Sequence, residues 1–396
     1  MFRHPNRLSI KHKNNNVSII KDKKIAIVGG GPGGLTLARL LQMHGAEVTV
    51  YERDANRHAR AQGATLDLHD ESGLRAIREA GLWDEFMANY RPGADRLRIM
   101  DKDANTIFED DINGPDERQR PEIDRGPLQN ILLDSLLPDT VMWDSHFVAM
   151  EKQNAGWVLE FKNGISVYAD IVIAADGANS KIRPYVTPIK PFYAGLTAIE
   201  GAVYDSAKNS PKIHALLNGG KIFAMGDSKS LIVSSKGDGS LVFYPGCKKD
   251  ENWLRDCGID FTDKAQALAW FKQEYQGWDD VWQELFENAS TGLIPRQIFS
   301  MPTDQTWDAQ PNLTMLGDAA HLMPPYAGEG VNMAMLDAVE LSECLLNDEY
   351  ESIHGAIAAY EMQMRKRASA TTQESLDSTA MLHSPDAIAF LSQVIG

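Results

Sequence analysis

Residues 24–53, KIAIVGGGPGGLTLARLLQMHGAEVTVYER, carry the pattern that sets the architecture of this chain. The apolar run at 25–28 predicts a buried parallel strand. The apolar positions at 35–41 predict a helix that ends at Gly45. A second strand over 47–51 leads to Glu52. Strand, glycine-rich turn, helix and strand in this order predict a β-α-β unit.

Three glycines in GxGxxG spacing, Gly29, Gly31 and Gly34, lie between the first strand and the helix. In such a turn the first glycine allows a tight bend, the second lets the backbone approach a pyrophosphate, and the third lets the helix pack on the strand. The pyrophosphate would sit at the helix N-terminus, and Glu52 would accept hydrogen bonds from a ribose. This context predicts a dinucleotide site, which NAD and FAD both fit; the alternative is a structural turn without a ligand.

Composition limits the partners of the chain. Its 396 residues are 43% hydrophobic, enough for a sizeable core, and no apolar run reaches the length of a membrane span. The formal net charge of −16 argues against a nucleic-acid partner, which would need a basic surface. The three cysteines form no CxxC pair and fit a reducing, cytoplasmic setting. Residues 1–22 are expected to be a disordered leader, and no metal is expected, because no histidine has ligand-spaced partners.

The rest of the chain contains two more strands of the parallel-sheet type and a β-rich middle. The apolar strands are expected at 171–175 and 313–316, and short strands separated by Gly, Asn, Asp and Ser fill 193–246. This pattern of short strands predicts an antiparallel sheet inserted between parts of the first domain. A hairpin is expected over 97–109, and a long amphipathic helix over about 352–378.

Asp176 and Gly177 directly follow the apolar strand at 171–175. A carboxylate and a tight turn at this point would enter the crevice at the carboxyl ends of the strands, where ligands of open α/β sheets bind. An ordinary strand-exit turn is the alternative, because Asp-Gly is a common turn pair.

Gly317 and Asp318 follow the other apolar strand and open a loop rich in Gly and Pro. Asp318 could hold the hydroxyls of a ribityl chain. Gly328 and Gly330 would let the backbone approach a planar ring, and the N-terminus of the next helix would stabilise the negative charge of a reduced flavin. His321, in the same loop, is expected to be structural rather than a general base. This loop favours FAD over NAD.

Together these motifs resemble those of the single-component FAD-dependent aromatic hydroxylases, the class A flavin monooxygenases. The motifs are GxGxxG with Glu52, Arg125-x-x-Leu128-x-x-x-Leu132, Asp176-Gly177, and Gly317-Asp318 followed by Gly328-x-Gly330-x-Asn332. Within that group the chain is most similar to the tetracycline-inactivating monooxygenases. The closer similarity lies in YERD at 51–54, TLDLH at 65–69 and GDAAHLMPPYAG at 317–328.

The resemblance implies an α/β fold with a Rossmann-like FAD-binding domain, an inserted antiparallel β-sheet substrate domain and a long C-terminal bridging helix. The expected FAD-binding domain spans 23–186 and 297–350 and includes part of the substrate sheet near 94–112. The expected substrate-binding domain spans 187–296, and C-terminal helices span 351–396.

The resemblance also implies which residues contact FAD. Glu52 and Arg53 match an adenosine-end pair, Arg60 matches an arginine near the isoalloxazine and the nicotinamide approach, and Asp318 matches a ribityl contact. From the residues alone, Arg60 and Arg125 could equally be surface salt-bridge residues. The complete expected cofactor set is Gly29, Gly31, Pro32, Gly34, Glu52, Arg53, Arg60, Asp67, Leu68, Arg125, Asp176, Gly317, Asp318, Pro325, Gly328, Gly330, Val331 and Asn332.

The activity that the resemblance implies needs no protein nucleophile. NADPH or NADH would reduce FAD, and O2 would form a flavin C4a-hydroperoxide that hydroxylates an aromatic, polycyclic or enol-bearing small molecule. The chain has no second GxGxxG, so the reductant is expected to bind transiently. A monomer is expected, with a tetracycline-like antibiotic, and hence antibiotic resistance, as one possibility.

Residues of the β-rich middle would contact the substrate. Glu200, Lys221 and Val242 align with a glutamine, an arginine and a histidine that hold the polar edge of the drug in the tetracycline-inactivating enzymes, so all three positions differ. Glu329 also stands where that family more often has glutamine. Aromatic and apolar side chains that could line the pocket, or simply form core, are Phe192, Phe223, Met225, Tyr244, Tyr326 and Met381.

Two other functions remain open from the sequence. A flavin-dependent reductase or oxidase of the same superfamily would keep the fold and change the chemistry. A non-enzymatic flavin-binding protein would bind FAD without turnover. Uptake of labelled oxygen during substrate-stimulated NADPH oxidation distinguishes the three.

Overall fold

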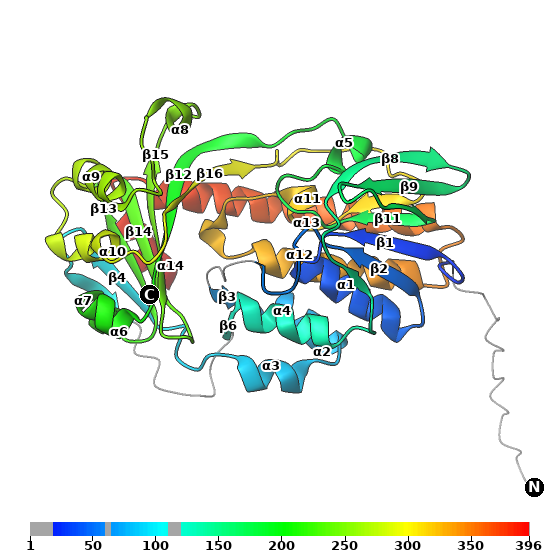
Figure 1. Ribbon diagram of the computed structural model, residues 1–396, viewed down its shortest axis with the longest axis horizontal. Helices are drawn as coiled ribbons and strands as arrows, with labels where there is room; N and C mark the ends of the chain where they lie inside the picture. The colour runs from blue at the N-terminus through cyan, green and yellow to red at the C-terminus, as the bar shows by residue number, and fades with distance from the viewer. Residues whose placement is uncertain (1–18, 60–64, 110–119, 396) are drawn as a thin grey trace, which may run out of the picture.

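The computed structural model describes residues 19–59, 65–109 and 120–395. The molecule is elongated, with a parallel sheet and its helices at one end and a larger sheet at the other (Figure 1). Most of the expected leader and Arg60 lie outside the described residues. The described chain begins with a turn at residues 19–22, whose Ile20 is buried in the core.

The expected β-α-β unit is present within a five-stranded parallel sheet of order β17-β11-β1-β2-β7. The apolar strand beginning at Ile25 pairs with the apolar strand beginning at Ile171, and both are buried. Side chains on both sheet faces are covered, which explains the continuous apolar runs. The strands are β1 (Lys24–Val28), β2 (Glu47–Tyr51), β7 (Val141–Met142), β11 (Ile171–Ala174) and β17 (Leu313–Met315).

Helix α1 (Pro32–Met43) packs against α12 (Gly330–Leu346) beside this sheet. The contact is close: a Cβ on Gly33 would lie 2.7 Å from the carbonyl oxygen of Ala334. The glycine-rich turn therefore also makes room for the helix that follows the Gly317–Asp318 loop. The remaining helices of this part are α2 (Gly73–Glu79), α3 (Trp83–Asn89), α4 (Arg125–Asp134), α5 (Arg183–Val186), α11 (Asp318–His321) and the 3-10 turn η2 (Pro325–Ala327).

Two small antiparallel sheets accompany the parallel sheet. One pairs β3 (Thr65–Asp67) with β6 (Glu122–Asp124) and brings Thr65 opposite Asp124. The other consists of β8 (Phe147–Gln153), β9 (Gly156–Phe161) and β10 (Ser166–Ala169).

The larger sheet has seven strands in the order β16-β12-β15-β14-β13-β4-β5. The expected hairpin is confirmed, because β4 and β5 pair antiparallel. The strands of the inserted region pair antiparallel, as expected, and the joint between β13 and β4 is parallel. The strands are β4 (Leu97–Asp101), β5 (Thr106–Glu109), β12 (Phe192–Val203), β13 (Lys221–Gly226), β14 (Lys229–Ser235), β15 (Leu241–Lys248) and β16 (Ile294–Ser300).

A second hydrophobic core, rich in aromatic rings, lies between this sheet and short helices. Phe243 of the sheet contacts Phe286 with ring centroids 5.2 Å apart, and Phe286 stacks on Phe271 at 4.1 Å. The helices are α6 (Ser206–Asn209), α7 (Pro211–Leu217), α8 (Trp253–Asp256), α9 (Lys264–Glu274), η1 (Asp280–Trp282) and α10 (Gln283–Glu287).

The long C-terminal helix α13 (Ile353–Leu382) connects the two ends of the molecule, as Figure 1 shows. It packs against α12 near the parallel sheet and against α14 (Ala387–Ile395), which in turn contacts β13 and β4. The helix is four residues longer at its C-terminus than the expected end near 378. Among the described residues, no helix combines the length and apolar character needed to cross a bilayer.

Candidate functional site

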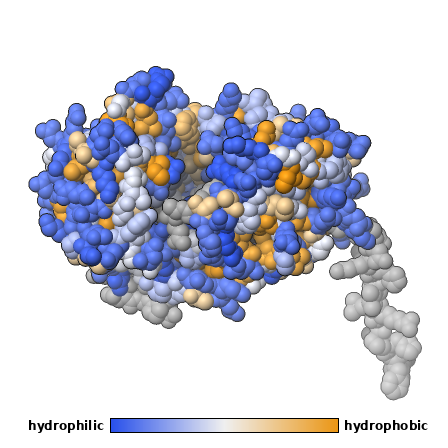
Figure 2. All heavy atoms as spheres, in the orientation of Figure 1, coloured by the Kyte–Doolittle hydropathy of each residue, from blue (hydrophilic) through white to orange (hydrophobic). Residues whose placement is uncertain are grey.

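A cavity of about 1430 Å³ is lined by residues from both ends of the molecule. The hydrophilic face in Figure 2 is hollowed near its middle. The expected cofactor and substrate residues that line the cavity are Gly31, Pro32, Glu52, Asp67, Arg125, Asp318, Pro325, Gly328, Glu200, Lys221, Phe223, Tyr326 and Tyr244. One cavity therefore joins the glycine-rich turn to the seven-stranded sheet.

Several expected site residues are not part of the cavity lining. Val242 is 3% exposed on β15, and Met225 is fully buried on β13, whereas Phe192 is 43% exposed. Expected residues outside the cavity's described lining are Gly29, Gly34, Arg53, Leu68, Asp176, Gly317, Gly330, Val331, Asn332, Val242, Met225, Phe192 and Met381.

The glycine-rich turn has the geometry that a pyrophosphate requires. Gly29 has φ +115°, and a Cβ there would lie 2.1 Å from the carbonyl oxygen of Ala175. A Cβ on Gly31, by contrast, would meet nothing within 4 Å, because this residue faces the cavity. Helix α1 begins at Pro32 without a side-chain cap or an acidic residue in its first turn. Its N-terminal N–H groups and positive dipole end therefore fit an anion.

Glu52 at the end of β2 is 5% exposed and closes one side of the turn. Its Oε2 accepts a hydrogen bond from the Gly30 amide at 2.6 Å, and its Oε1 accepts one from the Asp54 amide at 3.0 Å. The carboxylate lines the cavity. Glu52 is thus fixed against the glycine-rich turn, where an adenosine ribose would lie in a β-α-β dinucleotide site.

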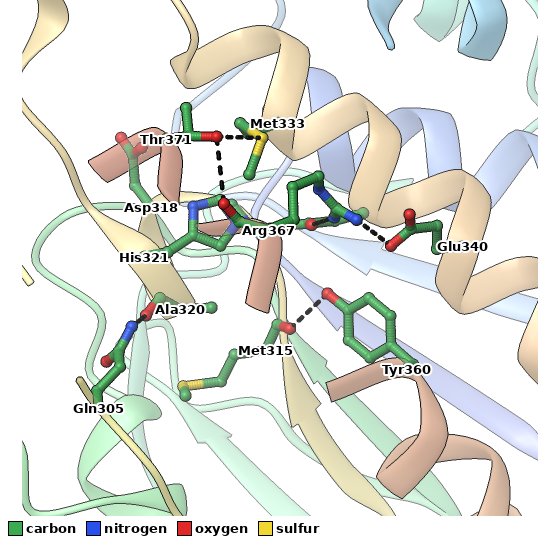
Figure 3. A network of polar contacts seen from close by, with 12 residues as sticks. Gln305, Met315, Asp318, Ala320, His321, Met333, Glu340, Tyr360, Arg367 and Thr371 are labelled. Carbon is green, nitrogen blue, oxygen red and sulfur yellow. Dashed lines mark hydrogen bonds and ion pairs between the residues drawn. The ribbon is translucent and has the colours of Figure 1, made fainter. Parts of the chain in front are cut away.

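Asp318 lies on a loop that a buried polar network holds in place (Figure 3). Asp337 of α12 accepts hydrogen bonds from the Gly317 amide at 2.8 Å and from Arg367 of α13 at 2.5 Å. It also contacts His321 Nε2 at 2.6 Å. His321 is 1% exposed and is held by this network, so its position is that of a structural residue, as expected.

Burial raises the pKa of the Asp318 carboxyl, although the charges of His321, Arg125 and Arg183 act in the opposite direction. A carboxyl group that is partly desolvated and faces a cavity is a strong hydrogen-bond partner for ligand hydroxyl groups. This arrangement fits the ribityl chain of FAD.

Arg183 was not identified from the sequence, and it joins the two loops that follow β11 and β17. Its Nε donates to the carbonyl of Ala319 at 2.7 Å, and its Nη2 donates to the carbonyls of Asp318 at 2.8 Å and Ala178 at 3.1 Å. Asp176 itself accepts from the Lys181 amide at 2.7 Å, as in an ordinary turn. The Asp176–Gly177 loop therefore supports the Asp318 loop from behind.

Asn332, fully buried at the start of α12, fixes the loop that begins at Gly328. Its Oδ1 accepts from the His69 amide at 2.9 Å, and its Nδ2 donates to the carbonyl of Asp67 at 2.9 Å. The residue ties β3 to α12 and positions Asp67, which lines the cavity. A sequence pattern alone did not suggest this supporting role.

A row of alternating charges crosses from α12 to the larger sheet, which we call the charge row: Glu329, His69, Asp67, Lys221 and Glu122. His69 Nδ1 lies 3.2 Å from Glu329, and its Nε2 lies 3.1 Å from Asp67. Lys221 forms an ion pair with Glu122 and interacts electrostatically with Asp67. The row connects the strand pair β3–β6 with β13.

The pKa values within the charge row follow from burial and neighbouring charge. Burial would lower the pKa of His69, but the two carboxylates outweigh it and raise the pKa to about 9. Burial would raise the pKa of Asp67, but His69 and Lys221 outweigh it and lower it. For Glu122 burial prevails, and its pKa is raised despite the Lys221 ammonium.

The side of the substrate end that lies opposite the charge row carries one ion pair and several apolar side chains. Arg296 of β16 donates to Glu200 of β12 at 2.9 Å. Apolar lining residues come from the sheet and from α14, and they are Phe223, Ile232, Ile298, Phe390, Leu391 and Val394. In the described part of the chain, no group of His, Cys, Asp and Glu side chains has an arrangement that could hold a metal ion.

Comparison with known proteins identifies the family. Residues 22–375 match the model of the FAD binding domain family, so the chain belongs to this family. This match, together with the monooxygenases among the relatives and solved structures, confirms the resemblance to the class A flavin monooxygenases seen in the motifs. Monooxygenase asqM of Emericella nidulans is 27% identical over 419 residues, covering 88% of this chain and 92% of the relative.

Solved structures share the fold. The structure of HpxO from Klebsiella pneumoniae, complexed with FAD and uric acid, has a TM-score of 0.76 at 23% identity and covers 96% of this chain and 93% of its own. The tetracycline destructase Tet(51) has a TM-score of 0.71 at 17% identity and covers 94% of each chain. The α/β fold with an FAD-binding domain and a long C-terminal helix is thus confirmed.

Proposed function

We propose that the protein hydroxylates an aromatic, polycyclic or enol-bearing small molecule with NAD(P)H and O2, using bound FAD. The observation that carries this proposal is the single cavity that reaches from Gly31 to Phe223. When bound, FAD would supply the redox chemistry, since it can accept electrons from NAD(P)H and react with O2. The route through a C4a-hydroperoxide remains a prediction of the family resemblance.

The residues of this chain would bind and orient the cofactor. The N-terminus of α1 would bind the pyrophosphate, Glu52 and Arg53 the adenosine end, and Asp318 the ribityl hydroxyls. The loop at Gly328 would lie beside the isoalloxazine, supported from behind by Asn332. The other residues that we assign to the cofactor site are Gly29, Gly34, Arg60, Asp67, Leu68, Arg125, Asp176, Gly317, Pro325, Gly330 and Val331.

The substrate would lie between the charge row and the apolar wall. Phe223 and the α14 side chains would exclude water from the reacting ring, while Lys221, Glu200 and Tyr326 would orient its polar edge. The fold of a tetracycline destructase keeps a tetracycline among the candidate substrates. Lys221 lacks the bidentate fork of an arginine, however, so the drug would have to bind differently here.

The remaining assignments are also proposals. We propose an FAD-binding domain over 23–186 and 297–350, a substrate domain over 187–296 and C-terminal helices over 351–396. We further propose that the protein acts as a cytoplasmic monomer, that NADPH or NADH binds transiently, and that neither nucleic acid nor a membrane is a partner.

The test begins with the purified protein, which should be yellow and should bleach anaerobically with NADPH or NADH. A panel of phenolic and polycyclic compounds, including a tetracycline, is then screened for faster NAD(P)H oxidation, with labelled O2 supplied. Label in the product supports the proposal. A reduced product without O2 uptake would identify a reductase, unlabelled oxidised product an oxidase, and FAD without any turnover a binding protein.

A further inference from the structure

The cavity as a whole carries an excess of negative charge. Nine carboxylate side chains line the cavity, against five Lys and Arg side chains, among the residues that the structure describes. Several of these carboxylates belong to the cofactor end, where FAD would add further negative charge at its pyrophosphate. An anion that enters this cavity therefore meets a repulsive field.

Of the five cations that line the cavity, the two on the seven-stranded sheet, Lys221 and Arg296, are already paired. Lys221 forms its ion pair with Glu122, and Arg296 directs its guanidinium to Glu200, with Nε and Nη2 both 2.9 Å from Oε2. A substrate carboxylate that approached either of these two cations would have to displace its partner. Displacement would leave a carboxylate of the protein without its cation in a partly desolvated site, which is costly.

Glu122 independently indicates that the substrate end can accept a further hydrogen-bond donor or cation. The residue lines the cavity while only 3% exposed, and its buried Oε2 makes no hydrogen bond of standard geometry among the described residues, with the Thr65 hydroxyl as a neighbouring donor. Buried carboxylate oxygens are normally hydrogen-bonded. Burial keeps the pKa of Glu122 raised although Lys221 and Thr65 lower it, so these two partners do not fully compensate the burial, and an additional donor or cation would.

We propose that the substrate end selects an aromatic compound that carries a protonated amine, with Glu122 as the residue that recognises it, and that it discriminates against aromatic carboxylates. The inference rests on the proposed function only for the location of the substrate. The apolar wall of Phe223 and Leu391 would cover the ring, and the ammonium would donate to Glu122 and Asp67. Lys221 then orients the polar edge of the substrate indirectly, because its ion pair with Glu122 holds that carboxylate in place.

Three probes with the same ring test the charge preference: meta-hydroxybenzylamine, meta-hydroxybenzyl alcohol and meta-hydroxybenzoate. Their affinities for the FAD-loaded protein are measured by titration calorimetry at neutral pH, without reductant. We expect the amine to bind tightest and the carboxylate weakest, with at least about a tenfold difference between them. Equal affinities, a preference for the carboxylate or no measurable binding of the amine would overturn the proposal.

The Glu122→Gln variant tests whether Glu122 causes the preference for the amine over the carboxylate. Removing the carboxylate frees the Lys221 ammonium, so the ratio of amine to carboxylate affinity should fall about tenfold or invert. Asp227→Asn removes a carboxylate from an ion pair with Lys102, outside the cavity lining, and should leave the ratio unchanged. If Glu122→Gln does not fold, Glu200→Gln at the more exposed pair should shift the ratio in the same direction. An unchanged ratio in the folded variant would contradict the assignment.

The titration separates this inference from the proposed function. It needs neither NAD(P)H nor O2, so a protein that binds the amine but never consumes O2 refutes the monooxygenase and leaves the charge preference standing. A protein that retains FAD and incorporates oxygen, yet prefers the carboxylate, refutes the charge preference alone.

Discussion

The carboxyl group of Asp318 is the single side chain on which cofactor retention should depend most. We expect Asp318→Ala to weaken FAD binding at least about tenfold, because hydrogen bonds to a charged or desolvated carboxyl each contribute roughly 1.5–3 kcal/mol. The ratio of flavin to protein absorbance after dialysis measures this loss. The Asp227→Asn variant is the control, and an Asp318→Ala protein that stays fully yellow would remove Asp318 from the site.

His69 should make stability depend on pH in a defined window. Its pKa rises from an ordinary value of about 6.5 to about 9 in the fold. A raised pKa means that the contribution to stability is complete below about pH 6.5 and disappears as the pH rises through about 9. Across this window the wild type should lose on the order of 2 kcal/mol more than His69→Gln, measured from urea-unfolding midpoints.

The control for this measurement is His44→Gln, since His44 is exposed at the end of α1. This variant should follow the pH profile of the wild type. Profiles of wild type and His69→Gln that stay parallel from pH 6 to 9 would contradict the charged state of His69.

His69 also shows which contacts could not be predicted from the sequence. The pattern around Gly29 and Gly34 identified a dinucleotide turn because all its contacts are local. The partners of His69 come from β3 and from the loop before α12, which are more than 250 residues apart in the chain. Likewise, Val242 lies at a plausible strand position, two residues before the cavity-lining Tyr244, but its side chain is buried and is not part of the cavity lining.

At the scale of elements, two glycines of the turn between β1 and α1 have different roles. Gly34 is needed for folding, and Gly31 is needed for ligand binding. A Cβ on Gly34 would lie 2.2 Å from the carbonyl oxygen of Gly29, whereas a Cβ on Gly31 would meet open space. We expect Gly34→Ala to lower the melting temperature by several degrees or to prevent folding, since backbone atoms would have to move. Gly31→Ala should fold normally and lose FAD affinity at least about tenfold, because its methyl group would occupy the approach of the pyrophosphate.

The two variants control each other, and melting curves with and without added FAD measure both effects. A Gly34→Ala protein with wild-type stability would show that α1 can shift away from the sheet. A Gly31→Ala protein with wild-type FAD affinity would place the pyrophosphate elsewhere.

Elements were predicted well where apolar periodicity and turn residues coincide, as for β1, α1 and the β4–β5 hairpin. The parallel joint between β4 and β13 was not predicted, because it pairs residues 97–101 with residues 221–225 and no local signal marks it. Its physical effect is considerable, since it brings Lys221 from the inserted region to the edge of the strand pair β3–β6.

At the scale of the whole molecule, FAD should act as a stabilising ligand. It would contact loops that follow β1, β3 and β17, so removal should loosen several distant segments together. At a free concentration about 100-fold above Kd, FAD should add about 2.7 kcal/mol to stability and raise the melting temperature measurably. Scanning calorimetry of the stripped and reloaded protein tests this, with NAD as a control dinucleotide that should give a smaller shift.

The position of α14 has a practical consequence for handling the protein. This helix contributes Phe390, Leu391 and Val394 to the cavity wall only a few residues before Gly396. A purification tag fused after Gly396 would directly follow this helix, whereas the described chain begins at residues 19–22, where Ile20 packs in the core around the parallel sheet. Inhibitor screens and crystal soaks should therefore use N-terminally tagged protein, and a C-terminal tag should be cleaved before any affinity is recorded.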